Sequence, residues 1–318
     1  MDRFATIDVG TNTVLLLVAE RRPAPAAPGE RFAFTPVVER AEITRLGRGV
    51  DRSGRLEERA IRDTVEVVAR YAAEARALGA RGIACVATSA ARDATNGADF
   101  FEAARAAAGL TPEVIPGDEE ARLVWASAWK DFGGGAAGGL AVLDVGGGST
   151  ELCLGSGASP AARRSLQIGA VRLTERVAPP DPPGPAAAAA LRRGAAEALR
   201  GAAELLPAGR APAGRMVGVA GTVTTLAAVE RELAVYEAGV VHGLELSLST
   251  LSALYDRLAG LTVAERQRLP GMEPKRADVI VGGCAIVIEA MRLLGFDRLT
   301  VSDRGVRWGL LYDRFSDD

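Results

Sequence analysis

The sequence predicts an α/β protein made of two similar halves. Short apolar runs alternate with stretches of helical periodicity along the 318 residues. An apolar run, an aspartate and a glycine-containing turn occur twice, around Asp8 and around Asp144, which lie 136 residues apart. At roughly 150 residues per domain, the length also suggests two domains. These observations favour duplicated domains that face each other across a cleft.

The first half is expected to form a mixed or parallel sheet covered by helices. Apolar runs at 4–8 and 14–19 flank a turn of small residues, a pattern typical of two tightly joined strands. The other apolar runs of strand length lie at 32–38, 41–46, 83–87 and 113–115. Helical spacing of apolar side chains predicts helices over 56–78, 98–108 and 118–129. Residues 23–29 are predicted to be the tip of a hairpin and 88–92 a turn.

The second half repeats this plan after a connection rich in glycine and alanine at 133–139. Its strands are predicted at 140–143, 152–154, 216–220 and 299–301. Its helices are predicted at 185–206, 276–294 and 305–315. We therefore expect domains at 1–125 and 126–304, with the closing segment 305–318 packed back on the first domain.

The composition excludes several classes of protein. The 38 Lys and Arg residues and 40 Asp and Glu residues give a net charge of −2, which argues against a protein that coats a nucleic-acid polymer. The only histidine is His242, so sites built from several histidines are excluded. The three cysteines lie far apart in apolar runs and are expected to be buried, reduced thiols.

Localisation follows from the same kind of evidence. No uncharged apolar run reaches the roughly 18 residues that a membrane span needs. The chain passes from Met1 straight into a strand pattern, without the pattern of a signal peptide. We expect a cytoplasmic protein that does not bind a membrane.

The two aspartate–glycine turns are candidate phosphate sites. A glycine turn lets backbone N–H groups point into a concavity and approach a phosphate closely. Side-chain donors in or beside these turns are Thr11, Asn12, Ser149 and Thr150. A third turn, at Gly221 and Thr222, ends a strand and opens a helix, whose N-terminus suits an anion. The alternative for this third turn is an ordinary threonine N-cap.

Carboxylates accompany the turns. Asp8, Asp144 and Glu151 lie at or near the two glycine turns, and a phosphate there would repel them unless a divalent cation lay between. Mg²⁺, which prefers oxygen ligands and keeps some of its waters, is the natural cation. The alternative is that Asp8 and Asp144 orient waters or cap the turns.

Two further groups are candidates for the chemistry. Residues 118–120 are three acids at a helix start, where one glutamate can act as a general base on water; alternatively they only complement the helix dipole. Arg92 follows a strand and is well placed for bidentate phosphate binding; alternatively it is a solvated surface side chain. Arg45 is a weaker candidate, and no catalytic role is expected for His242.

Taken together, these motifs resemble those of the acetate and sugar kinase/Hsp70/actin superfamily, and within it the exopolyphosphatase/guanosine pentaphosphate phosphatase family. The two phosphate turns at 7–13 and 144–151 and the third turn at 219–222 carry the resemblance. Further matching motifs run in the family's order from end to end of the chain, at 88–92, 117–122, 167–172, 276–278 and 302–305. The Asp-x-Gly-Gly-Gly-Ser-Thr-Glu and Glu-Glu-Ala-Arg motifs are the specific ones.

The resemblance implies two ribonuclease-H-like domains facing across an active-site cleft, and Mg²⁺-assisted release of terminal phosphate from a phosphoanhydride chain. By motif position, Glu120 is the general base that activates water. Metal or water is held by Asp8, Asp144 and Glu151. Phosphate is bound by Gly10, Thr11, Asn12, Arg92, Gly146, Gly147, Gly148, Ser149, Gly221 and Thr222.

The expected substrates are inorganic polyphosphate, guanosine pentaphosphate or both, and a homodimer is expected because the family often dimerises. Two alternatives are a phosphotransferase of the same superfamily and a non-catalytic protein that binds the alarmone or polyphosphate. The chain departs from the family at Pro116, where a small polar residue usually precedes the glycine that opens the Glu-Glu-Ala-Arg helix. It also has no histidine to supply the His/Asp-type domain of longer members.

Overall fold

The computed structural model describes residues 2–23, 32–133, 138–205 and 214–316, and it divides into two compact α/β units. The first unit comprises Met1–Leu123 and Val306–Asp318, and the second comprises Val124–Gly305. The predictions for residues 24–29, 134–137 and 206 lie outside the described residues. None of the described helices is both long and apolar enough to cross a bilayer.

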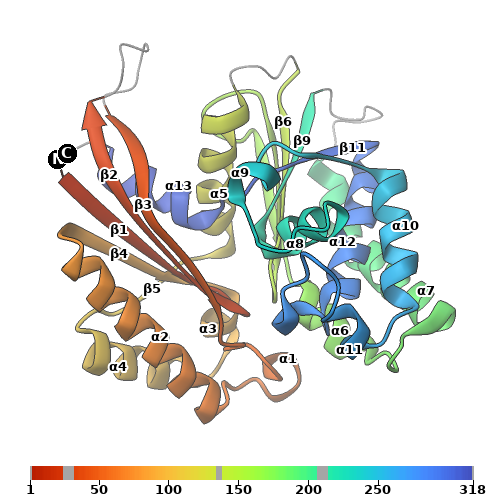
Figure 1. Cartoon of the computed structure of the whole chain (residues 1–318), viewed down its shortest axis with the longest axis horizontal. Helices are drawn as coiled ribbons and strands as arrows, with labels where there is room; N and C mark the ends of the chain where they lie inside the picture. The colour runs from red at the N-terminus through yellow and green to blue at the C-terminus, as the bar shows by residue number, and fades with distance from the viewer. Residues whose placement is uncertain (1, 24–31, 134–137, 206–213, 317–318) are drawn as a thin grey trace. The chain divides into compact units, whose positions relative to one another are not determined.

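The sheet of the first unit has the order β3-β2-β1-β4-β5 (Figure 1). The strands are β1 (Asp2–Val9), β2 (Thr13–Pro23), β3 (Phe32–Ile43), β4 (Ala80–Ala87) and β5 (Glu113–Val114). The first three form an antiparallel meander, while β4 pairs with β1, and β5 with β4, in parallel. The sheet is therefore mixed, as predicted.

Helices cover both faces of this sheet, and β1 is therefore buried on both sides. Its residues Ala5, Ile7 and Val9 join the core with helices α2 (Glu58–Ala77) and α4 (Gly97–Ala108). Its alternate residue Phe4 packs with Trp308 and Leu311 of α13 (Val306–Phe315) on the other face. The remaining helices of this unit are α1 (Val50–Ser53), α3 (Ser89–Asp93) and the start of α5 (Gly117–Phe132).

The sheet of the second unit has the order β10-β11-β9-β6-β7-β8. The strands are β6 (Leu140–Val145), β7 (Thr150–Gly155), β8 (Ala162–Leu166), β9 (Arg215–Val219), β10 (Glu245–Ser247) and β11 (Arg298–Val301). Here β6, β7 and β8 form the meander, and β9 and β11 continue from β6 in parallel. Both sheets thus contain the same five-stranded plan, the ribonuclease-H-like order that the resemblance implies.

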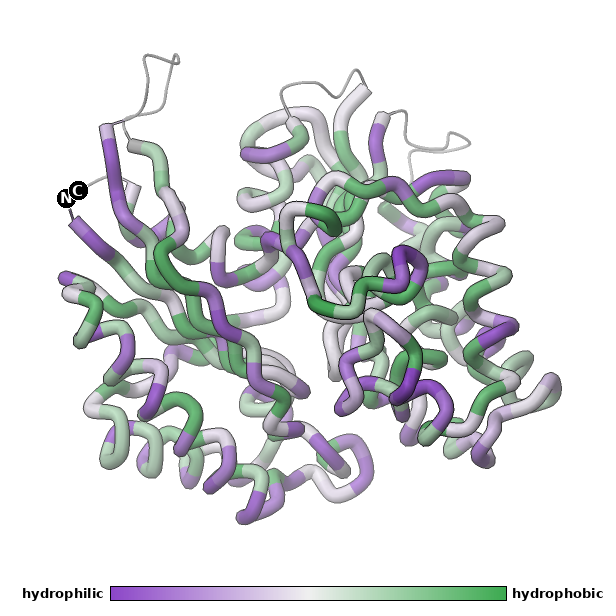
Figure 2. Tube along the Cα trace, in the orientation of Figure 1, coloured by the Kyte–Doolittle hydropathy of each residue, from purple (hydrophilic) through white to green (hydrophobic). Residues whose placement is uncertain are grey.

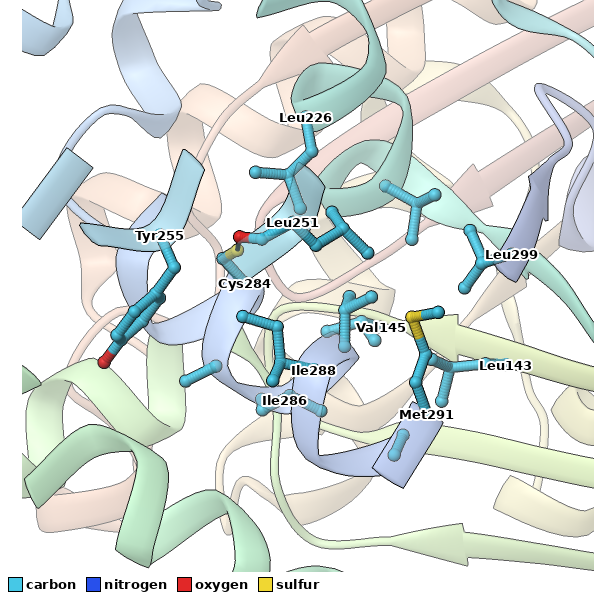
Figure 3. Close-up of a cluster of buried hydrophobic side chains, with 14 of the residues drawn as sticks. Leu143, Val145, Leu226, Leu251, Tyr255, Cys284, Ile286, Ile288, Met291 and Leu299 are labelled. Atoms are coloured by element: carbon cyan, nitrogen blue, oxygen red, sulfur yellow. Dashed lines mark hydrogen bonds between the residues drawn. The ribbon is translucent and has the colours of Figure 1, made fainter. Parts of the chain in front are cut away.

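The core of the second unit is centred on α12, whose residues Ile280–Leu294 are almost all buried. Figure 3 shows Cys284, Ile288 and Met291 of α12 among side chains of β6, α8, α10 and β11, with the Cys284 thiol directed at the Leu251 carbonyl oxygen. The other helices are α6 (Ala170–Val177), α7 (Gly184–Leu199), α8 (Ala220–Glu230), α9 (Ala238–Val241), α10 (Leu248–Ala259) and α11 (Val263–Arg266). All three cysteines are buried and unbridged, as expected.

Several element boundaries differ from the prediction. Residues 32–43 form one strand, β3, with a register shift opposite Val18 and Ala19, so the prediction of two separate strands was wrong. Leu46, predicted to end the second of them, lies in the loop that follows β3. The turn at 88–92 is the short helix α3, and α12 begins at Ile280, after a separate 3-10 helix at Pro274–Arg276. The Ala-rich helix α7 ends at Leu199 and continues as 3-10 helix.

Candidate active site

The turn between β1 and β2 is closed by a hydrogen bond from the Gly10 N–H to the Thr13 carbonyl, at 3.0 Å. A Cβ on Gly10 would lie 3.1 Å from that oxygen, so the turn favours glycine there. Thr11 and Asn12 are buried, and the Nδ2 of Asn12 has no hydrogen-bond partner among the described residues. A buried amide donor without a partner is costly, so this turn has hydrogen-bonding capacity that a bound phosphate would satisfy.

The turn between β6 and β7 has the same geometry. Gly146 donates to the Ser149 carbonyl at 3.1 Å, and a Cβ on Gly146 would also lie 3.1 Å from that oxygen. Gly169 lies so close that its Cβ would be 2.4 Å from the backbone of Gly147. Arg172 donates from Nε to the Gly148 carbonyl at 2.8 Å. The second turn is therefore held from outside by the segment that follows β8.

The three predicted metal-binding acids are all buried, and the structure places two of them side by side. Asp144 on β6 faces Glu151 on β7 in register. Glu151 accepts a hydrogen bond from the Ser165 hydroxyl on β8, at 2.7 Å, a partner that the sequence did not reveal. Asp8 belongs to the first unit, where it faces Leu15 on β2.

Asp8 is an unusual carboxyl group. It is 7% exposed, and its Oδ1 has no hydrogen-bond partner among the described residues. Burial raises the pKa of Asp8 to about 7, and the nearby Arg307 guanidinium opposes that rise. An orphaned carboxylate oxygen in a buried position is a suitable ligand for a divalent cation.

Among the three acids that open α5, Glu120 is the buried one. Asp118 is exposed, and Glu119 forms a two-armed ion pair with Arg122, at 2.8 and 2.6 Å. The Pro116 carbonyl accepts hydrogen bonds from the N–H groups of Glu119 and Glu120. These are backbone bonds that any residue at position 116 could accept, so the departure at Pro116 leaves the first turn of the helix intact.

Arg92 on α3 is paired with Glu120. Its Nη1 donates to the Ile115 carbonyl at 2.9 Å and lies 3.4 Å from Glu120 Oε2. Its Nη2 is buried and has no hydrogen-bond partner in the described part of the chain. Its Nε also lies 3.7 Å from Asp93 Oδ1. Arg92 is therefore oriented by protein atoms through Nη1 and Nε while Nη2 stays a potential donor to an anion, so it is not a solvated surface side chain.

The third turn is joined to the second. Thr222 does not cap α8 but donates from Oγ1 to the carbonyl of Val145, the residue before Gly146, at 3.0 Å. The guanidinium of Arg276 lies against Gly221, where a Cβ would be 2.1 Å from Nη2. Arg276 is a candidate that site prediction missed, although its motif at 276–278 was among the matching ones; no spacing rule connects it with Gly221.

His242 occupies a structural position. Its ring packs on Phe132, with 5.2 Å between ring centroids, and its Nδ1 accepts the Asp303 N–H at 3.3 Å. Its Nε2 also lies 3.9 Å from Asp131 Oδ2.

Strand direction explains how each unit gathers these groups. In the first unit the parallel strands β1, β4 and β5 all end at one edge, where they are followed by the first turn, by Arg92 and by Glu120. In the second unit β6, β9 and β11 end at one edge, followed by the second turn, the third turn and the segment 302–304. Open α/β sheets bind ligands at the carboxyl ends of their strands.

The family of the chain follows from comparison with known proteins. Residues 26–317 match the family model described as "Ppx/GppA phosphatase family". The chain belongs to the Ppx/GppA phosphatase family.

Relatives of this Ppx/GppA chain match over nearly its whole length. It is 39% identical to "Exopolyphosphatase 2" of Mycobacterium tuberculosis, with 98% of each chain covered. Among solved structures, an exopolyphosphatase-like protein is 30% identical with a TM-score of 0.88, covering 98% of both chains. The Ppx/GppA family member from Aquifex aeolicus is 31% identical with a TM-score of 0.79, covering 98% of this chain and 97% of that one. The chain is therefore an enzyme, a hydrolase of phosphoanhydride bonds.

Proposed function

We propose that this Ppx/GppA chain releases the terminal phosphate of inorganic polyphosphate, with Mg²⁺ as cofactor and Glu120 as general base. The observation that carries the proposal is the pairing of Glu120 with Arg92, whose second nitrogen, Nη2, is buried without a partner. This pair combines a proton acceptor with an anion-binding donor at the edge where the first phosphate turn lies. The names of the relatives, exopolyphosphatases, support polyphosphate as substrate.

Each group of residues has its own role in the proposed reaction. The backbone of the turns at Gly10–Asn12 and Gly146–Ser149 cradles phosphate oxygens, and Arg92 donates to the phosphate that is released. Glu120 accepts a proton from the attacking water as the water oxygen bonds to the terminal phosphorus. The bond from that phosphorus to the bridging oxygen breaks, and the chain that is one phosphate shorter leaves with the bridging oxygen. Gly221 and Thr222, with Arg276 beside them, bind further phosphate oxygens of the substrate.

The acids fit a Mg²⁺ ion. No three His, Cys, Asp or Glu side chains form a metal cluster within the described residues. Mg²⁺ does not require such a cluster, because it binds through one or two carboxylates together with waters and substrate phosphates. Asp144 and Glu151, which face each other, would hold it in the second unit, and the unpartnered Oδ1 of Asp8 is the candidate ligand in the first unit. When bound, the ion neutralises phosphate charge.

The deciding experiment compares Glu120→Gln with Glu119→Gln. Glutamine cannot accept the proton, so Glu120→Gln should lower kcat for phosphate release by about 10²- to 10⁴-fold while polyphosphate still binds. Glu119→Gln, which only weakens the ion pair to Arg122, should keep kcat within about twofold. Full activity of Glu120→Gln would refute its role as base.

Guanosine pentaphosphate is the second substrate that we propose, because the resemblance to the exopolyphosphatase/guanosine pentaphosphate phosphatase family implies it and its terminal bond is also a phosphoanhydride. Phosphate release should be measured side by side on short polyphosphate, long polyphosphate and guanosine pentaphosphate, with and without Mg²⁺. Tight binding without phosphate release would indicate a non-catalytic binder. Phosphorylation of a small molecule by ATP, without polyphosphate turnover, would indicate a phosphotransferase. Homodimerisation and a cytoplasmic location stay predictions.

A further inference from the structure

The segment that joins β3 to α2 carries a concentration of positive charge beside the first phosphate turn. Residues 44–55 contain four arginines and one aspartate, whereas the whole chain has a net charge of −2. The segment includes α1 and follows β3 (Figure 1), and Figure 2 shows hydrophilic stretches along it. Positive charge next to a phosphate site attracts a polyanion.

The start of this segment is fixed on the turn itself. The N–H groups of Thr44 and Arg45 both donate to the Asn12 carbonyl, at 3.1 and 3.0 Å, and Gly47 donates to the Thr11 carbonyl at 2.8 Å. A Cβ on Gly47 would lie 2.3 Å from Thr11 Cγ2, so the two backbones approach closely. The start of the segment therefore packs directly against the phosphate turn.

The end of the segment is fixed as well. Gly54 accepts hydrogen bonds from both the N–H and the hydroxyl of Thr95, at 2.9 and 3.0 Å. The Asn96 side chain bonds to the N–H and the carbonyl of Leu56, at 2.8 and 3.1 Å. Because both ends are held, the side chains between them project from a defined backbone.

Three arginines of this segment, Arg48, Arg52 and Arg55, are exposed and have no ion pair or side-chain hydrogen bond with any described residue. The neighbouring exposed arginines of α2 differ, since Arg59 pairs with Asp63 and Arg62 with Glu58. Arg45 is half-buried beside the turn and is not part of the group. We name Arg48, Arg52 and Arg55 the arginine track.

We propose that the arginine track binds the distal phosphates of a long polyphosphate chain whose terminal phosphate lies at the first turn. The inference rests on the proposed function and adds a chain-length preference to it. A guanidinium binds a phosphate with two parallel hydrogen bonds, and polyphosphate offers one phosphate after another along a flexible chain. Only a chain that extends beyond the turn reaches the track, so long substrates gain affinity and short ones do not.

The test is the triple variant R48Q/R52Q/R55Q, with R59Q/R62Q on α2 as the control. Each exposed contact is worth about a twofold change, so the triple variant should raise KM for long-chain polyphosphate by roughly tenfold. Its kcat on that substrate and its KM for tripolyphosphate should stay within about twofold of the wild type. Added salt should raise the wild-type KM for the long chain more steeply than that of the triple variant.

Several outcomes would overturn the proposal. One is an unchanged KM for the long chain in the triple variant, and another is an equal loss on tripolyphosphate, which would place these arginines at the reacting phosphate. A similar loss in R59Q/R62Q would indicate a diffuse effect of charge. If the wild type releases no phosphate from any polyphosphate, the proposed function fails, and direct titration of wild type and triple variant with long-chain polyphosphate still decides whether the track binds it.

Discussion

Replacing Asp8 by asparagine should stabilise the protein at neutral and alkaline pH when no divalent cation is present. Asp8 is buried at the end of β1, and its Oδ1 has no hydrogen-bond partner among the described residues. Burial raises its pKa from 3.8 to about 7, with Arg307 opposing the rise. The folded protein therefore favours the neutral acid, and asparagine is neutral at every pH and similar in shape.

The magnitude follows from proton linkage. Between about pH 4 and pH 7 the folded state holds a proton on Asp8 that the unfolded chain has lost, so the free energy of unfolding falls by about 1.4 kcal/mol per pH unit. The stabilising contribution is complete below pH 3.8 and is lost as the pH rises through about 7. Over the roughly three units between these values the loss reaches about 4 kcal/mol, and Asp8→Asn does not suffer it.

The assay is thermal unfolding in a chelator over the range from about pH 5 to pH 8. The Tm of Asp8→Asn should exceed that of the wild type by an amount that grows with pH, to about 10 °C at the upper end. Asp63→Asn, which changes an exposed carboxylate, should show a small difference that is the same at each pH. A difference between Asp8→Asn and the wild type that does not depend on pH would refute the reasoning. If Asp8 helps to hold Mg²⁺, adding Mg²⁺ should raise the Tm of the wild type more than that of Asp8→Asn.

Three further predictions concern groups around the turns. Ser165→Ala removes the hydroxyl that donates to Glu151, and should weaken Mg²⁺ activation by about 10-fold or more, measured as the Mg²⁺ concentration for half-maximal rate. Gly221→Ala forces the Arg276 guanidinium to move and should raise the KM for polyphosphate without lowering Tm by more than a few degrees. Its control is Gly239→Ala, whose Cβ would meet no atom within 4 Å and which should change neither the KM nor the Tm. Gly169→Ala places a Cβ 2.4 Å from the Gly147 backbone and should destabilise the protein by about 1–3 kcal/mol in chemical denaturation; wild-type stability would contradict the close approach seen at the second turn.

The sequence predicted the elements whose periodicity is strong. The helix over 56–78 agrees with α2 because its apolar side chains repeat with helical spacing, and the strand at 83–87 agrees with β4 because its apolar run is short and bounded. The break that was predicted between 38 and 41 was wrong. Glu39 and Arg40 are polar, yet they lie within β3, where pairing with Leu17 and Leu16 of β2 outweighs their local polarity.

Other features could not be found from sequence because they depend on distant partners. The strand β8 was missed because Ala162–Leu166 carries two arginines and lies at the sheet edge, where burial does not impose an alternating pattern. The helix α10 was missed although it contributes Leu251, Leu254 and Leu258 to the core. The contacts of Ser165 with Glu151 and of Arg276 with Gly221 span 14 and 55 residues, and only the fold brings them together.

The duplicated plan extends beyond the two turns, and this shows how the halves have diverged. In each half an apolar residue and a glycine follow the third strand and approach the turn: Gly47 lies against Thr11 in the first half, and Gly169 against Gly147 in the second. The positions that face the two aspartates differ, because Asp8 faces Leu15 whereas Asp144 faces Glu151.

The segment that follows the last parallel strand also differs between the two halves. After β5 the first half continues into α5 with Glu120, whereas after β11 the second half continues into Ser302 and Arg304. A single reaction needs only one general base, but it needs phosphate contacts on both sides of the transferred group. Both halves keep the backbone turn, while the carboxylate pair Asp144 and Glu151 lies in the second half and the proposed base Glu120 lies in the first.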